Sequence, residues 1–349
     1  MAFGKKDSLF LAYAFSMLAV VVEVQAVTLR GAEEAQESGK LNPRKETQNF
    51  AFSIAPEKWR STSRFRTNAT QKTMMFSPII PGNYSTYIYD TEDAYYEQYS
   101  KAFFGITSKK SGWDCMRHYE IIMSGSIPYF LNLDRIPAKT MTSFPKELIS
   151  RAMKLPGVPS EMEVWQAIYG GKVPEVNLDQ FDKAGYTKIR EELMKYAEQK
   201  LLSTSMAAKV VPSDASVYRV LIHSSHSSVG YGQYFLVNGL VNNGHSVCAR
   251  PHDMLDSMRD DYTGTTVGLT GRGYSWIRTV DHRKLAQDCS KGPWDYYLLV
   301  ADGNAKYPEP DPDAVKTAGK VIAINANDIG QAHLPVPAVA TEYFKREGN

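Results

Sequence analysis

The stretch VYRVLIHSSHSSVGYGQYFLVNGLVNNGHSVC, residues 217–248, predicts the fold class. Its apolar start, Val217–His223, is typical of a buried strand, and residues 233–241 have the composition of a helix that ends before Gly244. His245–Cys248 then begins another strand. A strand, a polar loop containing glycine, a helix and a second strand form the βαβ unit of a doubly wound parallel sheet.

The rest of residues 212–349 extends this pattern. Trp294–Ala301 is an apolar run of strand length that ends at Asp302-Gly303, and Lys320–Asn325 is another, with a helical pattern around residues 313–318 before it. Strands that alternate with helices predict a parallel sheet. We therefore expect one Rossmann-like domain over residues 212–349.

Residues 50–211 predict a second α/β domain. Short strands are expected at 87–89, 103–106 and 127–130, and helices at 92–100 and from 144 onward. Residues 155–176 contain several Pro and Gly and predict irregular structure. Phe181–Lys209 is the longest helical pattern, with apolar side chains along one face. We expect the two domains to face each other across a cleft.

Composition limits the function classes. The chain has 349 residues and 43% hydrophobic residues, enough for a large core and usually for two domains. Its net charge is +2 and its lysines and arginines are scattered, so the basic footprint of a nucleic-acid-binding protein is absent from the sequence.

The first residues predict targeting rather than fold. Lys5 and Lys6 precede a run of low polarity from Leu9 to Val22, and small residues follow near Ala26. This pattern is typical of a signal peptide over residues 1–26; a signal anchor and a buried helix are alternatives. Residues 27–49 are polar and predict a disordered leader or stem. The expected location is the secretory pathway, with a membrane as partner only if the leader is an uncleaved anchor.

Two glycosylation sequons and three cysteines bear on the compartment. Asn68-Ala-Thr70 and Asn83-Tyr-Ser85 fit a lumenal protein. Three cysteines exclude a scaffold held together by several disulfides. A Cys248–Cys289 bridge is one alternative, and we favour three buried free thiols.

Residues 113–130 carry the clearest candidate for a binding site. Arg117 and Glu120 are three apart, one helical turn, so both side chains can lie on the same face of a helix. Gly125 ends that helix before the strand at Ile127–Phe130. An arginine can pair with phosphate oxygens and a carboxylate can accept hydrogen bonds from sugar hydroxyls. The alternative is an ordinary surface salt bridge.

Arg117-His-Tyr-Glu120 followed by Gly125-Ser-Ile-Pro128 resembles the Arg-x-x-Glu…Gly-Cys-Ile-Pro segment of exostosin-like glycosyltransferases. In that family the segment lies in the nucleotide-sugar-binding half of the GT-B fold, which has two Rossmann-like domains. A wider set of blocks resembles glycosyltransferase-like proteins of microbes, algae and large viruses: Tyr95–Glu120, Thr140–Leu148, Gly271–Tyr274 and Tyr343–Glu347.

The order of the two halves differs from that set. There, the domain similar to residues 217–349 comes first and the segment similar to residues 50–210 follows it. In that set, the equivalent of Phe344–Glu347 leads directly into the equivalent of Phe50–Pro56. Here Phe344–Glu347 is at the end of the chain and Phe50–Pro56 is near its start. The chain therefore resembles a circularly permuted GT-B protein, or a piece of a tandem array. Domains that keep their own contacts tolerate a new opening in an exposed linker.

The resemblance implies a donor site that needs no metal or other cofactor. Glu120 would bind ribose hydroxyls, and Arg117 with Lys109 or Lys110 would stabilise the leaving diphosphate. The alternative for the two lysines is a solvated turn. Gly125 belongs to the same block.

A general base is expected from the other domain. His226 lies in the loop after the strand 217–223, where open α/β sheets bind ligands, and His223 and Asp302 are further candidates. His223 and His226 form an H-x-x-H pattern, but no third metal ligand is evident, so no metal site is predicted. The glycine cluster at 268–273 is more typical of a turn than of a phosphate loop.

The leading hypothesis is a glycosyltransferase that moves a sugar from a nucleotide-sugar to a lumenal glycan or glycoprotein. The alternative is a non-catalytic carbohydrate-binding or interaction protein on the same fold. A serine hydrolase and a dehydrogenase are disfavoured, because neither Gly-x-Ser-x-Gly nor Gly-x-Gly-x-x-Gly follows the strand 217–223.

Overall fold

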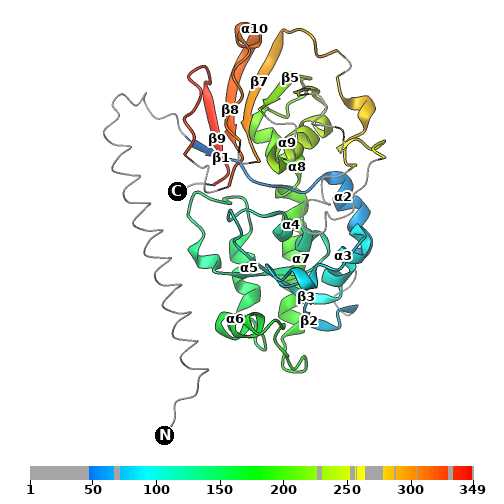
Figure 1. Ribbon diagram of the computed structural model, residues 1–349. Helices are drawn as coiled ribbons and strands as arrows, with labels where there is room; N and C mark the ends of the chain where they lie inside the picture. Colours follow the sequence, from blue (N-terminus) through cyan, green and yellow to red (C-terminus); the bar gives the residue numbers. More distant parts are fainter. Residues whose placement is uncertain are drawn as a thin grey trace, which may run out of the picture. The chain divides into compact units, whose positions relative to one another are not determined.

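The structure is α/β, as the sequence predicts. The computed structural model describes residues 47–66, 71–225, 230–251, 256, 258–263, 278–286, 288–303, 305–328 and 333–347. Within these residues, six strands form one sheet and three form another (Figure 1). Every strand pairing in both sheets is parallel. Both sheets are compatible with Rossmann-like domains.

The large sheet joins segments from distant parts of the chain. Its strands, in spatial order, are β1 (Thr47–Asn49), β9 (Glu342–Lys345), β8 (Ala318–Asn325), β7 (Trp294–Ala301), β5 (Arg219–Ser224) and β6 (Ser246–Arg250). Strand β1 pairs in register with β9, Asn49 opposite Lys345. The predicted leader, residues 27–49, therefore includes three residues that belong to this sheet.

The two faces of the large sheet are both buried, and this explains its apolar strands. Alternate residues of a strand point to opposite faces. Ile222 and Leu298 pack in the main core with α9 (Tyr231–Asn242), whereas Leu221 and Leu299 pack in a second core with Ala314 of α10 (Pro312–Thr317). Continuous apolar runs are what such a doubly covered parallel sheet requires.

The small sheet has the order β2 (Met74–Phe76), β3 (Ala102–Ser108), β4 (Ile127–Leu131). The helices before and after it are α2 (Pro56–Ser61), α3 (Glu92–Ser100), α4 (Met116–Met123), α5 (Lys146–Met153), α6 (Glu161–Tyr169), α7 (Lys183–Lys200) and α8 (Ser203–Val210). Four short 3-10 helices lie among the described residues: η1 (Thr62–Phe65), η3 (Tyr84–Thr86), η4 (Leu133–Arg135) and η7 (His282–Lys284). The main core is continuous from the small sheet to the large one.

Three secondary-structure predictions for residues 50–211 are wrong. Tyr87–Tyr89 is not a strand and follows the turn η3. Residues 155–176 contain helix α6, whose first turn is closed by a capping box between Ser160 and Glu163. The pattern over 181–209 is two helices, because the backbone at 201–203 leaves the helix to bond with Ile54.

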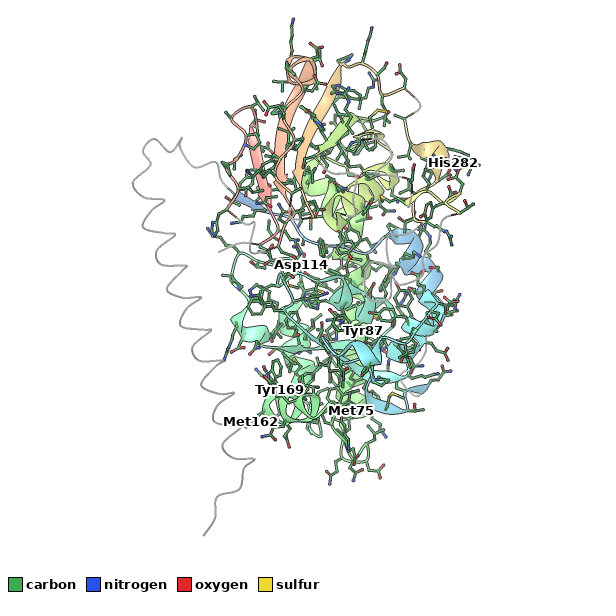
Figure 2. All side chains as sticks on the ribbon, in the orientation of Figure 1. Met75, Tyr87, Asp114, Met162, Tyr169 and His282 are labelled. Carbon is green, nitrogen blue, oxygen red and sulfur yellow. A yellow bond between two sulfur atoms is a disulfide. The ribbon has the colours of Figure 1, made fainter. Side chains whose placement is uncertain are left out.

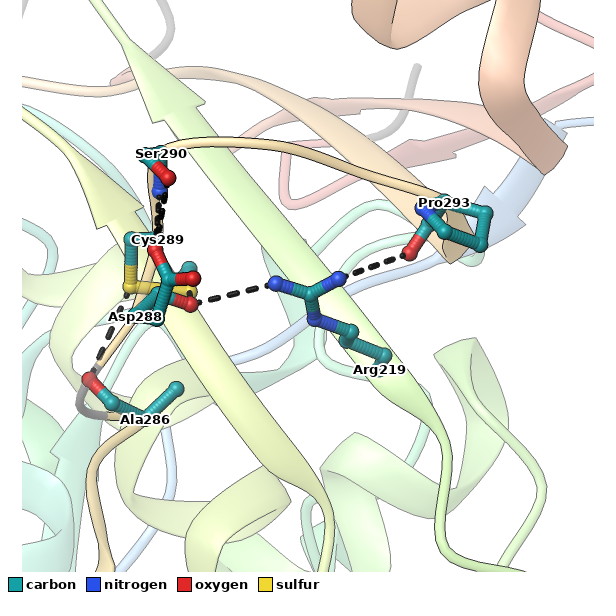
Figure 3. Close-up of a disulfide and its surroundings, with 7 residues drawn as sticks. Arg219, Ala286, Asp288, Cys289, Ser290 and Pro293 are labelled. Atoms are coloured by element: carbon teal, nitrogen blue, oxygen red, sulfur yellow. Dashed lines mark hydrogen bonds between the residues drawn. A yellow bond between two sulfur atoms is a disulfide. The ribbon is translucent and has the colours of Figure 1, made fainter.

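The cysteine prediction is also wrong. Cys248 of β6 and Cys289 form a disulfide, and only Cys115 is free (Figure 3). Strand β6 and the segment before β7 lie side by side here, since the Ala286 N–H donates to the Val247 carbonyl at 3.1 Å. Arg219 donates to the Asp288 carbonyl at 3.1 Å and holds the same segment against β5.

Lys45–Asn349 forms one compact unit. Among the residues that the structure describes, no helix combines the length and apolarity that a membrane span requires.

Candidate functional site

A cavity of about 330 Å³ lies where three parallel strands of the large sheet end. Asp302 and Gly303 follow β7, residues 326–328 follow β8, and Arg346 follows β9. With Tyr231 at the start of α9, these residues form what we call the α9 wall. Residues 110–112 and 114–117, the loop before α4 and its first turn, form the α4 wall. Open α/β sheets bind their ligands at this edge.

The cavity brings together three of the predicted site residues. Lys110 and Arg117 line it from the α4 wall and Asp302 lines it from the α9 wall. Lys109 does not line it; its Nζ lies 5.5 Å from the ring centroid of Trp113. Both lysines are exposed. The geometry therefore distinguishes two neighbouring lysines that the sequence could not.

Arg117 is buried, with 5% of its surface exposed. Its Nη2 donates to the Tyr87 hydroxyl at 3.0 Å, while its Nε–H has no hydrogen-bond partner. Burial works to lower the Arg117 pKa, but Cys115 and three nearby tyrosines together outweigh it, and the pKa is raised above the ordinary value. Arg117 is thus a fixed cation with one unused donor.

Glu120 lies in the core and does not line the cavity. Its Oε2 accepts a hydrogen bond from the Tyr95 hydroxyl at 2.9 Å, and its Oε1 has no partner. Burial raises the pKa of Glu120 to about 7. Neither Glu120 nor Arg117 is at the surface and they form no ion pair with each other, so the alternative of a surface salt bridge is wrong.

Gly125 ends α4 and lies outside the cavity. Its φ is +75°, and the N–H groups of Gly125 and Ser126 donate to the carbonyls of Ile122 and Ile121, which is the Schellman arrangement. The Gly125 carbonyl accepts from Arg190 Nε at 2.7 Å. The geometry of this turn therefore explains why residue 125 is a glycine, without a role in ligand binding.

Asp302 caps the start of α9 from another segment of the chain. Its two carboxylate oxygens accept the N–H of Gln233 at 3.0 Å and of Gly303 at 2.8 Å. A Cβ on Gly230 would lie 2.7 Å from the Asp302 carboxyl carbon, so glycine is required there. Burial raises the pKa of Asp302 to about 6 despite these bonds.

Arg346 is a buried residue with several hydrogen bonds, and the sequence did not predict this role. With 2% of its side chain exposed, it donates to the Ala326 carbonyl at 2.7 Å, to the Asp114 carbonyl at 2.6 Å and to the Asp328 carboxylate. Its guanidinium also lies 4.3 Å from the ring centroid of Phe52. Arg346 thus fastens the loop before α4 to the end of the large sheet.

Glu347 completes this connection. Its Oε1 accepts the Asp114 N–H at 3.0 Å, and burial raises its pKa to about 7. The Asp114 carboxylate in turn accepts the Phe52 N–H at 2.6 Å and the Tyr119 hydroxyl at 2.8 Å. Asp114 is labelled in Figure 2. No sequence signal links residues so far apart.

Neither histidine candidate for the general base is among the described residues that line the cavity. His226 lies outside the described residues. His223 does not line the cavity; its Nδ1 is 2.6 Å from the Tyr297 hydroxyl, and burial lowers its pKa.

One group of potential metal ligands is present among the described residues, away from this cavity. Asp260, Asp261 and His282 come within 4.8 Å of one another (His282 is labelled in Figure 2). His282 bonds to Asp260 at 2.9 Å and Asp261 pairs with Arg259 at 2.7 Å, so these contacts account for the arrangement.

No protein-family model, curated protein or solved structure matches the chain.

Proposed function

We propose that this protein is a glycosyltransferase that uses a nucleotide-sugar donor, built on a circularly permuted GT-B-like fold. The observation that carries the proposal is the cavity at the carboxyl ends of β7, β8 and β9. It joins the cations Lys110 and Arg117 with the carboxylate of Asp302 from another part of the chain. Its volume of about 330 Å³ is at the lower end of the range of about 300–1,000 Å³ that ligand pockets occupy.

The diphosphate of the donor is assigned to the α4 wall. The first turn of α4 contains no acidic residue and its N-cap, Cys115, makes no side-chain cap. The positive end of a helix dipole favours an anion there, and Lys110 and Arg117 add formal charge. The predicted ribose contact of Glu120 remains a prediction, since this side chain lies behind the cavity lining.

The acceptor is assigned to the α9 wall. In the transfer, a base takes the proton of the acceptor hydroxyl, its oxygen bonds to C1 of the sugar, and the bond from C1 to the diphosphate oxygen breaks. Asp302, with a pKa of about 6, can accept a proton near neutral pH. His226 is the other candidate. No metal or further cofactor is assigned a role.

The permuted order is supported by the contacts of the segment that follows β1. The Phe50 N–H donates to the Lys345 carbonyl at 2.9 Å, and Phe52 packs under Arg346. The segments that the resemblance expects to be continuous, residues 344–347 and 50–56, are therefore neighbours in space.

The proposed location is the lumen of the secretory pathway, with a glycan or glycoprotein as acceptor. The support is the leader pattern of residues 1–26 together with the Cys248–Cys289 disulfide, because disulfides persist mainly in oxidising compartments.

The test is calorimetric titration with uridine and guanosine diphosphates and their sugar conjugates. We expect binding that Lys110→Ala weakens about tenfold, since a charge-assisted contact is worth about 1.4 kcal/mol. Lys109→Ala is the matched comparison, an exposed neighbour that does not line the cavity, and we expect it to bind normally. If neither the diphosphates nor their sugar conjugates bind, the proposal is lost.

A second candidate is a non-catalytic carbohydrate-binding protein on the same fold. It is favoured by the engagement of the lining carboxylates: Asp302 caps α9, Asp114 holds Phe52, and Asp328 pairs with Arg346. Nucleotide-sugar binding without hydrolysis or transfer, unchanged by Asp302→Asn, would support this candidate over the enzyme.

A further inference from the structure

The sequon Asn83-Tyr84-Ser85 lies on a turn that the proposed transferase site does not use. Asn83 is the N-cap of η3, between β2 and α3. The Asn83 Oδ1 accepts the Ser85 N–H at 3.2 Å and the Ser85 hydroxyl at 2.7 Å. Its Nδ2, the atom that glycosylation modifies, makes no hydrogen bond to any described residue.

Asn83 is partly exposed and lies between the exposed residues Gly82 and Tyr84. At the preceding Gly82, a Cβ would meet no atom within 4 Å. Tyr84 is 69% exposed and Ile88 is 71% exposed, and both are large apolar side chains within five residues of Asn83. Isolated exposed apolar residues are ordinary, but Tyr84 is the middle residue of the acceptor motif and Ile88 follows it closely, and the motif calls for a surface position.

The turn is held in place rather than loosely attached. The Gly82 N–H donates to the Tyr87 hydroxyl at 3.1 Å, and the same hydroxyl accepts from Arg117 Nη2 at 3.0 Å. Tyr87 is labelled in Figure 2. The sequon is therefore presented outward from a fixed point on the body of the protein.

We propose that Asn83 is N-glycosylated and that the first sugars cover Tyr84 and Ile88. The proposal rests on the lumenal location proposed above. The co-reactant is a lipid-diphosphate-linked oligosaccharide, transferred by an oligosaccharyltransferase. The Asn83 Nδ2 bonds to C1 of the oligosaccharide, the bond from C1 to the lipid diphosphate breaks, and the amide gives up one proton. Apolar sugar faces then pack on the exposed phenol and the Ile88 side chain.

The test is translation of the full chain with endoplasmic-reticulum microsomes, followed by recovery of the protease-protected chain. Trypsin separates the two sequons, because Lys72 lies between them: residues 67–72 carry Asn68 and residues 73–101 carry Asn83. We expect the 73–101 peptide to show the Asn-to-Asp mass change after enzymatic removal of the glycan. Asn83→Gln and Ser85→Ala should abolish it and Ser85→Thr should retain it, whereas Asn68→Gln should leave it intact.

An unmodified 73–101 peptide in the protected chain would overturn the proposal, as would a chain that never becomes protected. The nucleotide titration is independent of this result, so a loss of the sequon proposal and a loss of the transferase proposal can be told apart. Tyrosine-selective labelling tests the covering by sugars: Tyr84 should react faster after the glycan is removed. Equal rates would refute that part.

Discussion

The two walls of the cavity differ in how their charges are satisfied. On the α9 wall, Asp302 caps a helix and Arg346 is bonded to two carbonyls and a carboxylate. On the α4 wall, the Asp114 carboxylate is bonded to a backbone N–H and a tyrosine hydroxyl, but its two cations are not satisfied: Lys110 is exposed without an ion pair among the described residues, and the Arg117 Nε–H has no partner. The comparison indicates that the α9 wall stabilises the fold, while the α4 wall is available to an anion.

Removal of Arg346 should have the largest effect on stability. Arg346→Ala leaves two carbonyls and Asp328 without this donor and removes the cation 3.7 Å from the buried Glu347 carboxylate, and breaking a buried pair costs about 4 kcal/mol. Urea denaturation measures the loss. The control is Lys320→Ala, which removes an ion pair with Glu342 at the surface and should cost at most about 1 kcal/mol. Equal losses for the two variants would contradict the role given to the α9 wall.

Asp302→Ala should come next. It removes the acceptor of the Gln233 and Gly303 N–H groups, and we expect a loss of about 3 kcal/mol in the free energy of unfolding. Asp302→Asn keeps one acceptor oxygen and should recover about half of this loss. If Asp302→Ala were as stable as the parent chain but inactive in sugar transfer, Asp302 would be purely catalytic.

Glu120 and Glu347 should stabilise the folded chain more as the pH falls from about 8 to about 5, whereas His118, whose pKa burial lowers to about 3, opposes this below about pH 6.5. Glu120 and Glu347 have folded-state pKa values of about 7, raised above 4.5 by burial, so the folded chain binds more protons than the unfolded chain in this window. Glu120→Gln should remove about 2–3 kcal/mol of this pH dependence, because the slope is about 1.4 kcal/mol per pH unit between about pH 7 and pH 5. Denaturation curves at several pH values measure it, and an unchanged slope would place Glu120 in a more polar setting than the structure does.

The smallest effect on stability should come from the α4 wall. Lys110→Ala changes an exposed side chain and should shift the free energy of unfolding by less than about 0.5 kcal/mol. The same variant should weaken nucleoside-diphosphate binding about tenfold. A stability loss comparable with that of Asp302→Ala would remove the distinction between the two walls.

Local sequence patterns predicted the helices and strands that form mainly because of their own residues. The helix over residues 92–100 and the strand over residues 294–301 are confirmed within their predicted bounds. The sequence does contain a start signal for helix α6, the capping box of Ser160 and Glu163. The Pro and Gly residues on either side favoured irregular structure instead. Strands β1 and β2 have three residues each, too few for an alternating pattern to be evident.

The candidate site was harder to predict than the helices and strands, because it depends on contacts between residues far apart in the sequence. Asp302 was expected at a strand end, but its role as a cap depends on the α9 amides, 69 residues away. Arg346 reaches Asp114 over 232 residues. The spacing of Arg117 and Glu120 predicted that both lie on one helix. The burial of Glu120 against Tyr95 follows from tertiary packing, which the spacing does not contain.

The pairing of β1 with β9 also determines when the large sheet can be completed during biosynthesis. Asn49 meets Lys345, 296 residues later, and β8 reaches β1 only through β9. At roughly 5–20 residues per second, the ribosome takes about 15–60 s to cover this interval. Throughout that time Thr47–Asn49 has no strand to join, so completion of the large sheet follows the synthesis of nearly everything that lies between.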